Sequence, residues 1–202
     1  MHNTDYWINQ YKEKNALWIY DGNPKRPHAR LTSNRHSNGF FNSRLVIPDE
    51  ILLRSAASDL LYLFDRQDGD IEKIDGVVGP QTGATKLAEF ISDQVRAHNM
   101  DSCFWASSAK HSNWDVKSMV FDDKDLDLFQ GHYILLCEDV LTTGESVDLT
   151  ATAVTNLGGI ILPFVVVLVN RSDFKEMSGR KIIALIDRPM PVWTLEECPL
   201  CK

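Results

Sequence analysis

Two adjacent acids, Glu138 and Asp139, stand directly after the apolar run of residues 133–137. A short hydroxyl-rich turn at residues 142–146 follows, and the pattern after it predicts a helix from residue 147 onward. An ionised carboxylate only accepts hydrogen bonds, so the acids suit the hydroxyl groups of a ribose. Backbone N–H groups and hydroxyls at the start of a helix favour a phosphate. The run therefore predicts a sugar-phosphate site at the carboxyl end of a strand.

A second turn with glycines follows another short apolar strand and precedes a helical pattern. Its residues are Gly79, Pro80, Gln81, Thr82 and Gly83. Glycine lets backbone N–H groups approach an anion closely, and the helix start again favours negative charge. An ordinary strand-to-helix turn without a ligand would show the same pattern. Two anion-binding turns at the carboxyl ends of strands in one sheet would nevertheless fit the place where open α/β sheets bind ligands.

The elements that must position these turns alternate along the chain. Helical spacing of apolar residues predicts helices over 5–20, from 48 to about 64, over 85–98 and over 147–157. Apolar runs predict strands over 74–79, 101–106, 117–121, 133–137, 160–169 and 181–186. Strands that alternate with helices indicate a mainly parallel sheet, and nearly continuous apolar strands indicate that both sheet faces are covered. We expect a single domain over residues 1–202, with residues 1–50 and 188–202 as a cap and tail over the sheet.

Composition excludes several classes of protein. The formal net charge of the 202 residues is −7, whereas nucleic-acid binding usually needs a basic stripe. The longest apolar run, 160–169, is too short to span a bilayer, and the first residues lack the pattern of a signal peptide. We therefore expect a cytoplasmic protein that binds neither nucleic acid nor membrane. A polyanionic ligand would need local help from helix starts, metal ions and a few placed cations.

The first turn resembles the phosphoribosyl pyrophosphate (PRPP) motif of type I phosphoribosyltransferases. That motif is an apolar strand, an acid pair, two further residues and Thr-Thr-Gly-x-Ser. The matching residues after the acid pair are Thr142, Thr143, Gly144 and Ser146, and Glu145 departs from the commoner small residue. The second turn is similar to the pyrophosphate loop of the orotate branch. The resemblance implies an α/β fold of the type I phosphoribosyltransferase kind, with helices on both sides of the sheet and a small N-terminal hood.

Two further segments resemble orotate phosphoribosyltransferases. Residues 31–42 are similar to an N-terminal segment whose aromatic pair, here Phe40 and Phe41, lines the base pocket. Thr32 stands where that family usually carries a lysine. Arg171, after the 160–169 run, matches an arginine that meets the carboxylate of the base, and a guanidinium can do so through two parallel hydrogen bonds. Core phenylalanines and a solvated arginine are the plainer interpretations of these residues.

Residues 107–114 lie between two expected strands and are polar enough to form a mobile loop. The orotate enzymes carry a catalytic loop here, rich in Lys and Arg, that closes over the pyrophosphate, usually at a neighbouring subunit's site. Lys110 matches one of those cations, whereas Ala106 and Ser107 stand where the family has more, unless Lys117 compensates. A lost charge-assisted contact to the leaving pyrophosphate costs about 1.5–3 kcal/mol. Either the substrate differs from orotate or the loop works by another geometry.

The chain has four cysteines. Cys103 and Cys137 lie in apolar runs and are expected in the core. Cys198 and Cys201 form a C-x-x-C that resembles the tail of some orotate-type enzymes. Two thiolates are half of a zinc site, which needs four ligands, and no second C-x-x-C occurs. We therefore expect no metal-ligating residues and an inert tail or a reactive thiol pair, with a zinc site across a dimer as the alternative.

Together the resemblances imply transfer of the phosphoribosyl group of PRPP onto a base nitrogen, with release of pyrophosphate. The favoured base is orotate, which would give orotidine 5′-monophosphate. Glu138 and Asp139 would hold the ribose hydroxyls, residues 142–146 the 5′-phosphate, and residues 79–83 with Lys110 and Mg²⁺ the pyrophosphate. A homodimer is expected. The alternatives are a purine or other base phosphoribosyltransferase and a non-catalytic PRPP-sensing regulator.

Overall fold

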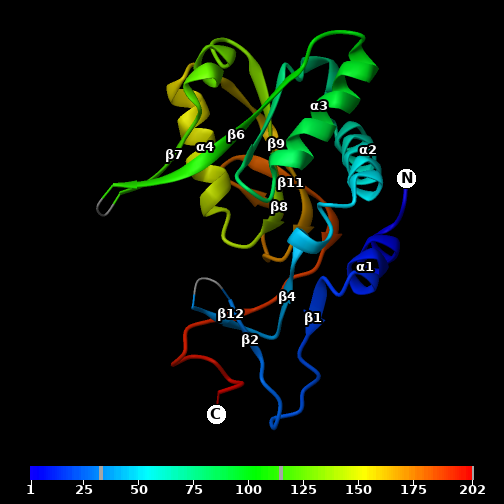
Figure 1. Cartoon of the computed structure of the whole chain (residues 1–202), viewed down its shortest axis with the longest axis vertical. Coiled ribbons are helices and arrows are strands. Elements are labelled where there is room, and N and C mark those ends of the chain that lie inside the picture. Colours follow the sequence, from blue (N-terminus) through cyan, green and yellow to red (C-terminus); the bar gives the residue numbers. More distant parts are fainter. Residues whose placement is uncertain (32–33, 114–115, 202) are drawn as a thin grey trace.

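The computed structural model describes residues 1–31, 34–113 and 116–201 (Figure 1). Its centre is a sheet in the order β10-β11-β9-β8-β5-β6-β7. The seven strands are β5 (Gly76–Pro80), β6 (Phe104–Asn113), β7 (Val116–Val120), β8 (Tyr133–Leu141), β9 (Ile160–Asn170), β10 (Glu176–Met177) and β11 (Arg180–Asp187). The four inner pairs of neighbours are parallel, and only the two edge pairs, β10–β11 and β6–β7, are antiparallel. The expectation of a mainly parallel sheet is confirmed.

Helices cover both faces of this sheet. They are α1 (Thr4–Glu13), α2 (Glu50–Arg66), α3 (Thr85–Asn99) and α4 (Glu145–Asn156), with short 3-10 helices η1 (Ser43–Leu45), η2 (Ile71–Lys73) and η3 (Asp123–Leu128). The first three pack on one face and α4 on the other. Asp49 caps α2 by accepting a hydrogen bond from the backbone N–H of Leu52 at 3.0 Å, which explains why that helix begins where the sequence predicts.

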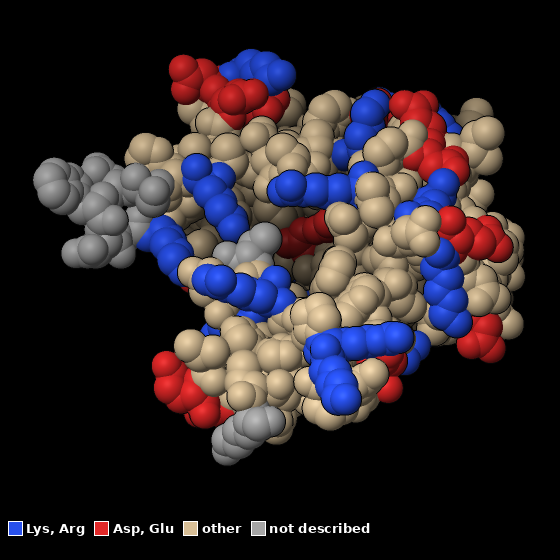
Figure 2. Space-filling model, turned by 60° about the horizontal axis from the view of Figure 1, so that its bottom comes forward, with Lys and Arg blue, Asp and Glu red and all other residues tan. Residues whose placement is uncertain are grey.

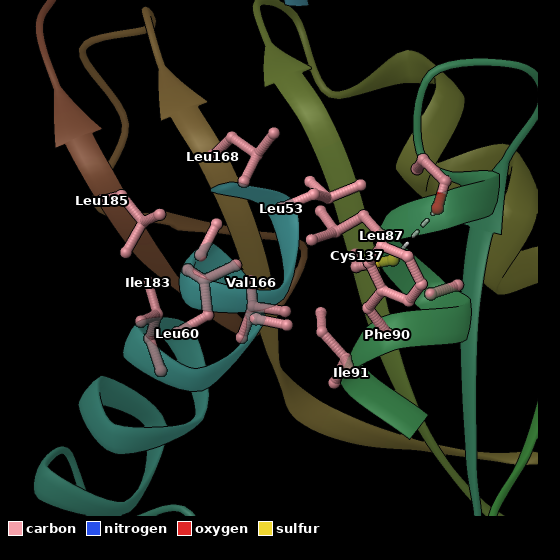
Figure 3. Close-up of a cluster of buried hydrophobic side chains, with 14 of the residues drawn as sticks. Leu53, Leu60, Leu87, Phe90, Ile91, Cys137, Val166, Leu168, Ile183 and Leu185 are labelled. Carbon is pink, nitrogen blue, oxygen red and sulfur yellow. Dashed lines mark hydrogen bonds between the residues drawn. The ribbon is translucent and has the colours of Figure 1, made fainter. Parts of the chain in front are cut away.

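The alternation of side chains along the central strands produces two separate cores. On β8, Leu135 and Cys137 pack with the buried side chains of α2 and α3, whereas Ile134 and Leu136 pack on the α4 side. Figure 3 shows the first of these clusters, in which Leu53 and Leu87 reach toward Cys137. Because both faces of the strand are buried, its sequence is apolar at every position up to Cys137.

Small strands below the main sheet form a unit that we call the hood, which consists of β1 to β4 and β12 (Figure 1). The strands are β1 (Leu17–Ile19), β2 (Ala29–Arg30), β3 (His36–Ser37), β4 (Gly39–Phe41) and β12 (Val192–Trp193). β1 pairs with β4, and β3 lies between β2 and the tail strand β12. The tail thus returns to the N-terminal segment.

The expected helix over 5–20 is wrong in its second half. The helix α1 ends at Glu13, and Asn15 takes a left-handed backbone conformation with φ of 54°. Residues 17–19 then pair with β4 as a strand. Trp7 and Tyr11 bury the helical half in the main core, so α1 belongs to the sheet, whereas β1 belongs to the hood.

The expected loop over 107–114 is also wrong, as far as residue 113. β6 continues to Asn113 and pairs with β7 from Ala109↔Val120 to Asn113↔Val116, and the hairpin projects from the sheet (Figure 1). The polar residues 107–113 lack the apolar pattern that predicts a strand, because this half of β6 extends beyond the core of the central sheet. Its backbone groups are satisfied by antiparallel pairing instead. Trp114 lies outside the described residues.

No helix within the described part of the chain is both long and apolar enough to span a bilayer. The apolar run near residue 160 is the central strand β9.

Candidate active site

A single cavity of about 640 Å³ lies between the carboxyl ends of the central strands and the hood. Its lining residues are Arg30, Leu31, Phe40, Phe41, Asn42, Ser43, Arg44, Lys110, Glu138, Asp139, Val140, Leu141, Thr142, Thr143, Gly144, Glu145, Ser146, Val147 and Arg171. Figure 2 shows this face hollowed, with acidic atoms inside the hollow and Lys and Arg side chains around its rim. We call residues 138–146 the β8 end of the cavity, and Arg30, Phe40 and Arg171 the hood end.

The acid pair lies on β8 itself, because the strand continues past Cys137 to Leu141. In a regular strand neighbouring side chains point to opposite faces. Here the alternation reverses after the acids: Val140 packs with the α2–α3 core, as Cys137 does, and Leu141 packs with the α4 core. This local twist allows Glu138 and Asp139 to line one cavity.

Glu138 is almost fully buried, at 8% exposure, and its Oε1 accepts a hydrogen bond from the backbone N–H of Asp139 at 3.0 Å. Burial raises the pKa of Glu138 well above its ordinary value, the neighbouring Asp139 charge raises it further, and Lys110 acts in the opposite direction. The protein alone therefore stabilises the ionised form of this carboxyl group poorly. Ligand hydroxyls that donate to it would supply what it lacks.

The hydroxylated turn starts α4. Gly144 takes φ of 77°, a left-handed conformation that glycine adopts without strain, and its carbonyl accepts the first helical hydrogen bond, from Asp148 N at 2.9 Å. The hydroxyl of Thr143 accepts a 3.4 Å hydrogen bond from the backbone N–H of Glu145. The remaining N–H groups of the first helical turn have no partner inside the helix and are available to an anion.

The second turn lies beside the acid pair although it does not line the cavity. Gly79 and Pro80 are buried at the end of β5, and residues 81–83 form the turn before α3. A Cβ added at Gly83 would lie 2.5 Å from Cγ of Asp139, so a larger residue there would displace the Asp139 carboxylate. The second turn is therefore adjacent in space to the acid pair.

The two aromatic residues of β4 face different surroundings. Phe40 is half-buried and stacks on Trp18, with ring centroids 5.9 Å apart and planes at 21°. Phe41 is 7% exposed, belongs to the core and packs edge-on against Tyr11 at 5.3 Å. Both residues border the cavity, but only the ring of Phe40 is not committed to the core.

Arg171 follows β9 and is 4% exposed. Its Nη2 donates to the Ser37 hydroxyl at 2.9 Å and to the backbone carbonyl of Gly39 at 3.3 Å, and its Nε has no hydrogen-bond partner among the described residues. Burial lowers the pKa of Arg171, yet a guanidinium remains charged. Within the described residues no carboxylate forms an ion pair with it. A buried cation without a counter-charge is a strong feature for an anionic ligand.

The hairpin brings one lysine to the cavity and gives the other a different partner. Lys110 on β6 lines the cavity. Lys117 on β7 instead forms an ion pair with Glu145 at 2.7 Å, which lowers the pKa of that carboxyl group. Lys117, which could have compensated for the cations missing at Ala106 and Ser107, is therefore paired with Glu145, the extra acid in the turn. Thr32, another departure from the family pattern, lies outside the described residues.

Two cations in the cavity wall escaped the sequence analysis. Arg30 lies at the end of β2 and Arg44 in η1, and both are exposed side chains that border the cavity. They flank residues 31–42, the segment singled out for its aromatic pair, so their place in the chain was the available signal. They add positive charge to the cavity wall, to which the hairpin contributes Lys110.

A cavity that joins an acid pair and a hydroxylated helix start at the carboxyl edge of a parallel sheet, with a second glycine-containing turn beside the acid pair, is the arrangement expected of a phosphoribosyltransferase of type I fold. The family described as "Phosphoribosyl transferase domain" matches residues 53–194, and the chain belongs to this family of enzymes. The expected family and fold are confirmed.

The chain is also similar to individual proteins, one compared by sequence and two by structure. The chain is 30% identical to the orotate phosphoribosyltransferase of Caldicellulosiruptor bescii, over 99% of this chain and 93% of that protein. The crystal structure of orotate phosphoribosyltransferase from Aeropyrum pernix is similar with a TM-score of 0.62 and 19% identity, over 88% of this chain and 91% of that one. The crystal structure of adenine phosphoribosyltransferase from Rhodothermus marinus is similar with a TM-score of 0.60 and 16% identity, over 90% of this chain and 98% of that one. At these identities the two structures show a shared fold and no more.

Proposed function

We propose that this protein transfers the phosphoribosyl group of PRPP to orotate, forming orotidine 5′-monophosphate and pyrophosphate. The observation that carries the proposal is the set of residues that line the cavity between the central strands and the hood. Its β8 end combines the acid pair with the hydroxylated helix start, and its hood end holds Arg171, buried and without a counter-charge. The sequence relatives named orotate phosphoribosyltransferase, at about 30% identity over most of the chain, support the same base.

At the β8 end, Glu138 and Asp139 would accept hydrogen bonds from the 2′ and 3′ hydroxyls of the ribose. The N–H groups and hydroxyls of residues 142–146 would hold the 5′-phosphate at the start of α4. The distance between these two elements is set by β8, because both belong to one continuous segment of strand, turn and helix. One ribose 5-phosphate can therefore span them.

The pyrophosphate group would lie toward residues 79–83, beside Asp139, with Lys110 contributing positive charge. Mg²⁺ fits this site as a hard cation, since the cavity offers carboxylate oxygens from Glu138 and Asp139 and the substrate brings phosphate oxygens. When bound, it would neutralise charge on the departing pyrophosphate. The ion would be held mainly by oxygens of PRPP, with few protein ligands.

At the hood end, the base would stack on the free face of Phe40, a type of contact worth roughly 1–3 kcal/mol in other base-binding proteins. The orotate carboxylate would pair with Arg171, whose Nε has no other partner. The hydrogen bonds from Arg171 to Ser37 and Gly39 hold the guanidinium in place before the base arrives. Pre-placed charge of this kind costs no reorganisation when the substrate binds.

During the reaction positive charge grows on the ribose ring as the bond to pyrophosphate breaks. The buried Glu138 and the partly buried Asp139 would lie beside that charge, and in their ionised forms they would stabilise it in a cavity that excludes most water. Alignment of the base nitrogen with the ribose carbon would supply the rest of the acceleration. We also propose a homodimer and a cytoplasmic location, as expected from the sequence and the family resemblance.

The proposal is tested by incubating the protein with PRPP, Mg²⁺ and a panel of bases while pyrophosphate release is followed. Orotate should react, and uracil, which is orotate without the carboxylate, should not. Reaction with adenine or hypoxanthine instead would show that the base is not orotate, and the protein would still be a phosphoribosyltransferase. Binding of PRPP without turnover of any base would identify a sensor.

A further inference from the structure

Four potential metal ligands from the two ends of the chain meet at the outer edge of the hood. His28 precedes β2 and His36 lies on β3, whereas Cys198 and Cys201 lie in the tail after β12. Their ligand atoms all lie within 4.8 Å of one another. Only the two thiols are recognisable in the sequence as a pair of ligands, because the histidines stand about 160–170 positions away and show no spacing relation to the tail. This cluster changes the ligand count on which the expectation of no metal depended.

The individual distances resemble those of a tetrahedral site. Cys198 Sγ lies 3.4 Å from Nε2 of His28, and Cys201 Sγ lies 3.5 Å from that atom and 3.2 Å from Nδ1 of His36. Zinc bonds of about 2.3 Å to sulfur and 2.0–2.1 Å to nitrogen place S and N ligands roughly 3.5 Å apart in a tetrahedron. The two ring nitrogens lie 2.7 Å apart and would have to separate by roughly 0.6 Å to reach the tetrahedral N–N distance.

The local structure presents these atoms to one point. A turn in which Cys201 N donates to Cys198 O at 3.2 Å brings both sulfurs to the same side of the tail. β12 pairs with β3 at Trp193↔His36, which brings the tail next to the second histidine. Cys198 is fully buried and Cys201 is exposed, so the cluster has a closed inner side and an open outer side through which an ion can enter.

We propose that His28, His36, Cys198 and Cys201 bind one Zn²⁺ in a structural site. Two thiolates with two imidazoles are a donor set that suits zinc, and four protein ligands leave no open position for a substrate. The ion would join the N-terminal hood to the C-terminal tail within one chain. This inference does not depend on the proposed function, because it concerns residues outside the cavity.

The place of the site suggests what it does. β3 carries a zinc ligand at His36 and, one residue later, Ser37, whose hydroxyl accepts the hydrogen bond from Arg171. The hood strands are only two or three residues long and bury little apolar surface by themselves. A zinc ion would hold these strands in register beside the cavity, as small units with a limited core require.

The test measures metal content and coordination in the full-length protein. Protein purified with added Zn²⁺ under reducing conditions, dialysed and analysed by mass spectrometry for metals should contain one zinc per chain. Replacement of zinc by Co²⁺ should give the strong d–d bands of a tetrahedral ion and a thiolate charge-transfer band. Cys201→Ser, an exposed position where folding is least disturbed, should weaken zinc binding by more than about 100-fold, since even second-shell losses cost 10- to 100-fold.

Matched controls separate this site from other thiols and imidazoles. Cys103→Ser and His98→Ala, which change residues outside the cluster, should keep the zinc and the cobalt spectrum, whereas His36→Ala should lose both. Circular dichroism of each variant checks folding. The proposal is overturned by wild-type protein without stoichiometric zinc, by a Cys198–Cys201 disulfide in reducing buffer, or by folded Cys201→Ser and His36→Ala variants that bind zinc as the wild type does. None of these outcomes depends on catalytic activity.

Discussion

The two ends of the cavity are built in opposite ways. The β8 end is one continuous segment, residues 138–146, in the middle of a seven-stranded sheet, and it is acidic. The hood end gathers Arg30, Phe40 and Arg171 from three separate segments, and it is basic. Its strands span only two or three residues each.

The two ends therefore differ in the part of the substrate that each would bind. In the proposed reaction, the ribose 5-phosphate would be bound by residues held on the central sheet. The base would be selected by residues that depend on the two small sheets of the hood, on hydrogen bonds from Arg171 and on the tail. We therefore expect substitutions at the β8 end to abolish the reaction with any base, and those at the hood end to change base use.

The largest effect is expected from the double variant Glu138→Gln/Asp139→Asn. The loss of two charge-assisted hydrogen bonds of about 1.5–3 kcal/mol each should reduce kcat/KM by roughly 10²- to 10⁴-fold. Steady-state kinetics with saturating orotate measure it, and Asp127→Asn, an exposed acid in η3, is the matched control. A double variant that keeps more than a tenth of the activity would contradict the proposed role of the acid pair at the β8 end.

Arg171→Ala should reduce kcat/KM for orotate by roughly 10²- to 10³-fold, because a bidentate contact to the carboxylate is lost. The affinity for PRPP, measured by calorimetry, should change little, since Arg171 belongs to the hood end. Arg171→Lys keeps a charge without the planar fork and should recover part of the activity. Equal losses for PRPP and orotate would show that the two ends are not independent.

Lys110→Ala should lower kcat by roughly 10- to 100-fold, the value of one charge-assisted contact to the leaving pyrophosphate. Lys110→Arg should restore most of it, and Lys124→Ala, an exposed lysine in η3, should have no effect. An unchanged kcat in Lys110→Ala would assign the pyrophosphate to Arg30 and Arg44 instead, which lie nearer the hood.

Glu138→Gln should stabilise the ligand-free protein while it impairs catalysis. Burial raises the pKa of Glu138 in the folded protein above its unfolded value of about 4.3, so stability is lost as the pH rises from that value through the folded pKa. The variant should therefore be more stable than the wild type near pH 7 and equal to it near pH 4. Urea unfolding at the two pH values measures this, and a variant less stable at neutral pH contradicts the role of burial.

The smallest effect concerns the ion pair between Lys117 and Glu145 at the rim of the β8 end. An exposed pair contributes about 0.2–1 kcal/mol. Glu145→Ala removes a carboxylate near the phosphate and should lower KM for PRPP by roughly 2- to 5-fold, whereas Lys117→Ala should raise it. In the double variant the effect of Lys117→Ala should largely disappear, and independent effects of the two changes would exclude the pairing in solution.

Much of the fold could be predicted, and the failures have physical causes. The helices α2, α3 and α4 and the central strands show their burial in their apolar patterns, so their predicted positions are confirmed within a few residues. The helix over 5–20 failed because Leu17, Trp18 and Ile19 continue an apolar pattern but pair with β4 as a strand. The strand over 117–121 is confirmed as β7, but the loop expected from residue 107 onward is wrong as far as residue 113, because the polar second half of β6 is held by backbone pairing with β7.

The sequence by itself determined the β8 end, because an apolar strand, an acid pair and a hydroxylated helix start follow one another and local chain geometry keeps them together. Only the tertiary structure decided that Arg30, Phe40 and Arg171 share one cavity, that Glu145 meets Lys117, and that two histidines meet Cys198 and Cys201. Contacts between distant segments depend on how the whole chain packs, and no periodicity or spacing along the chain records which segments will meet.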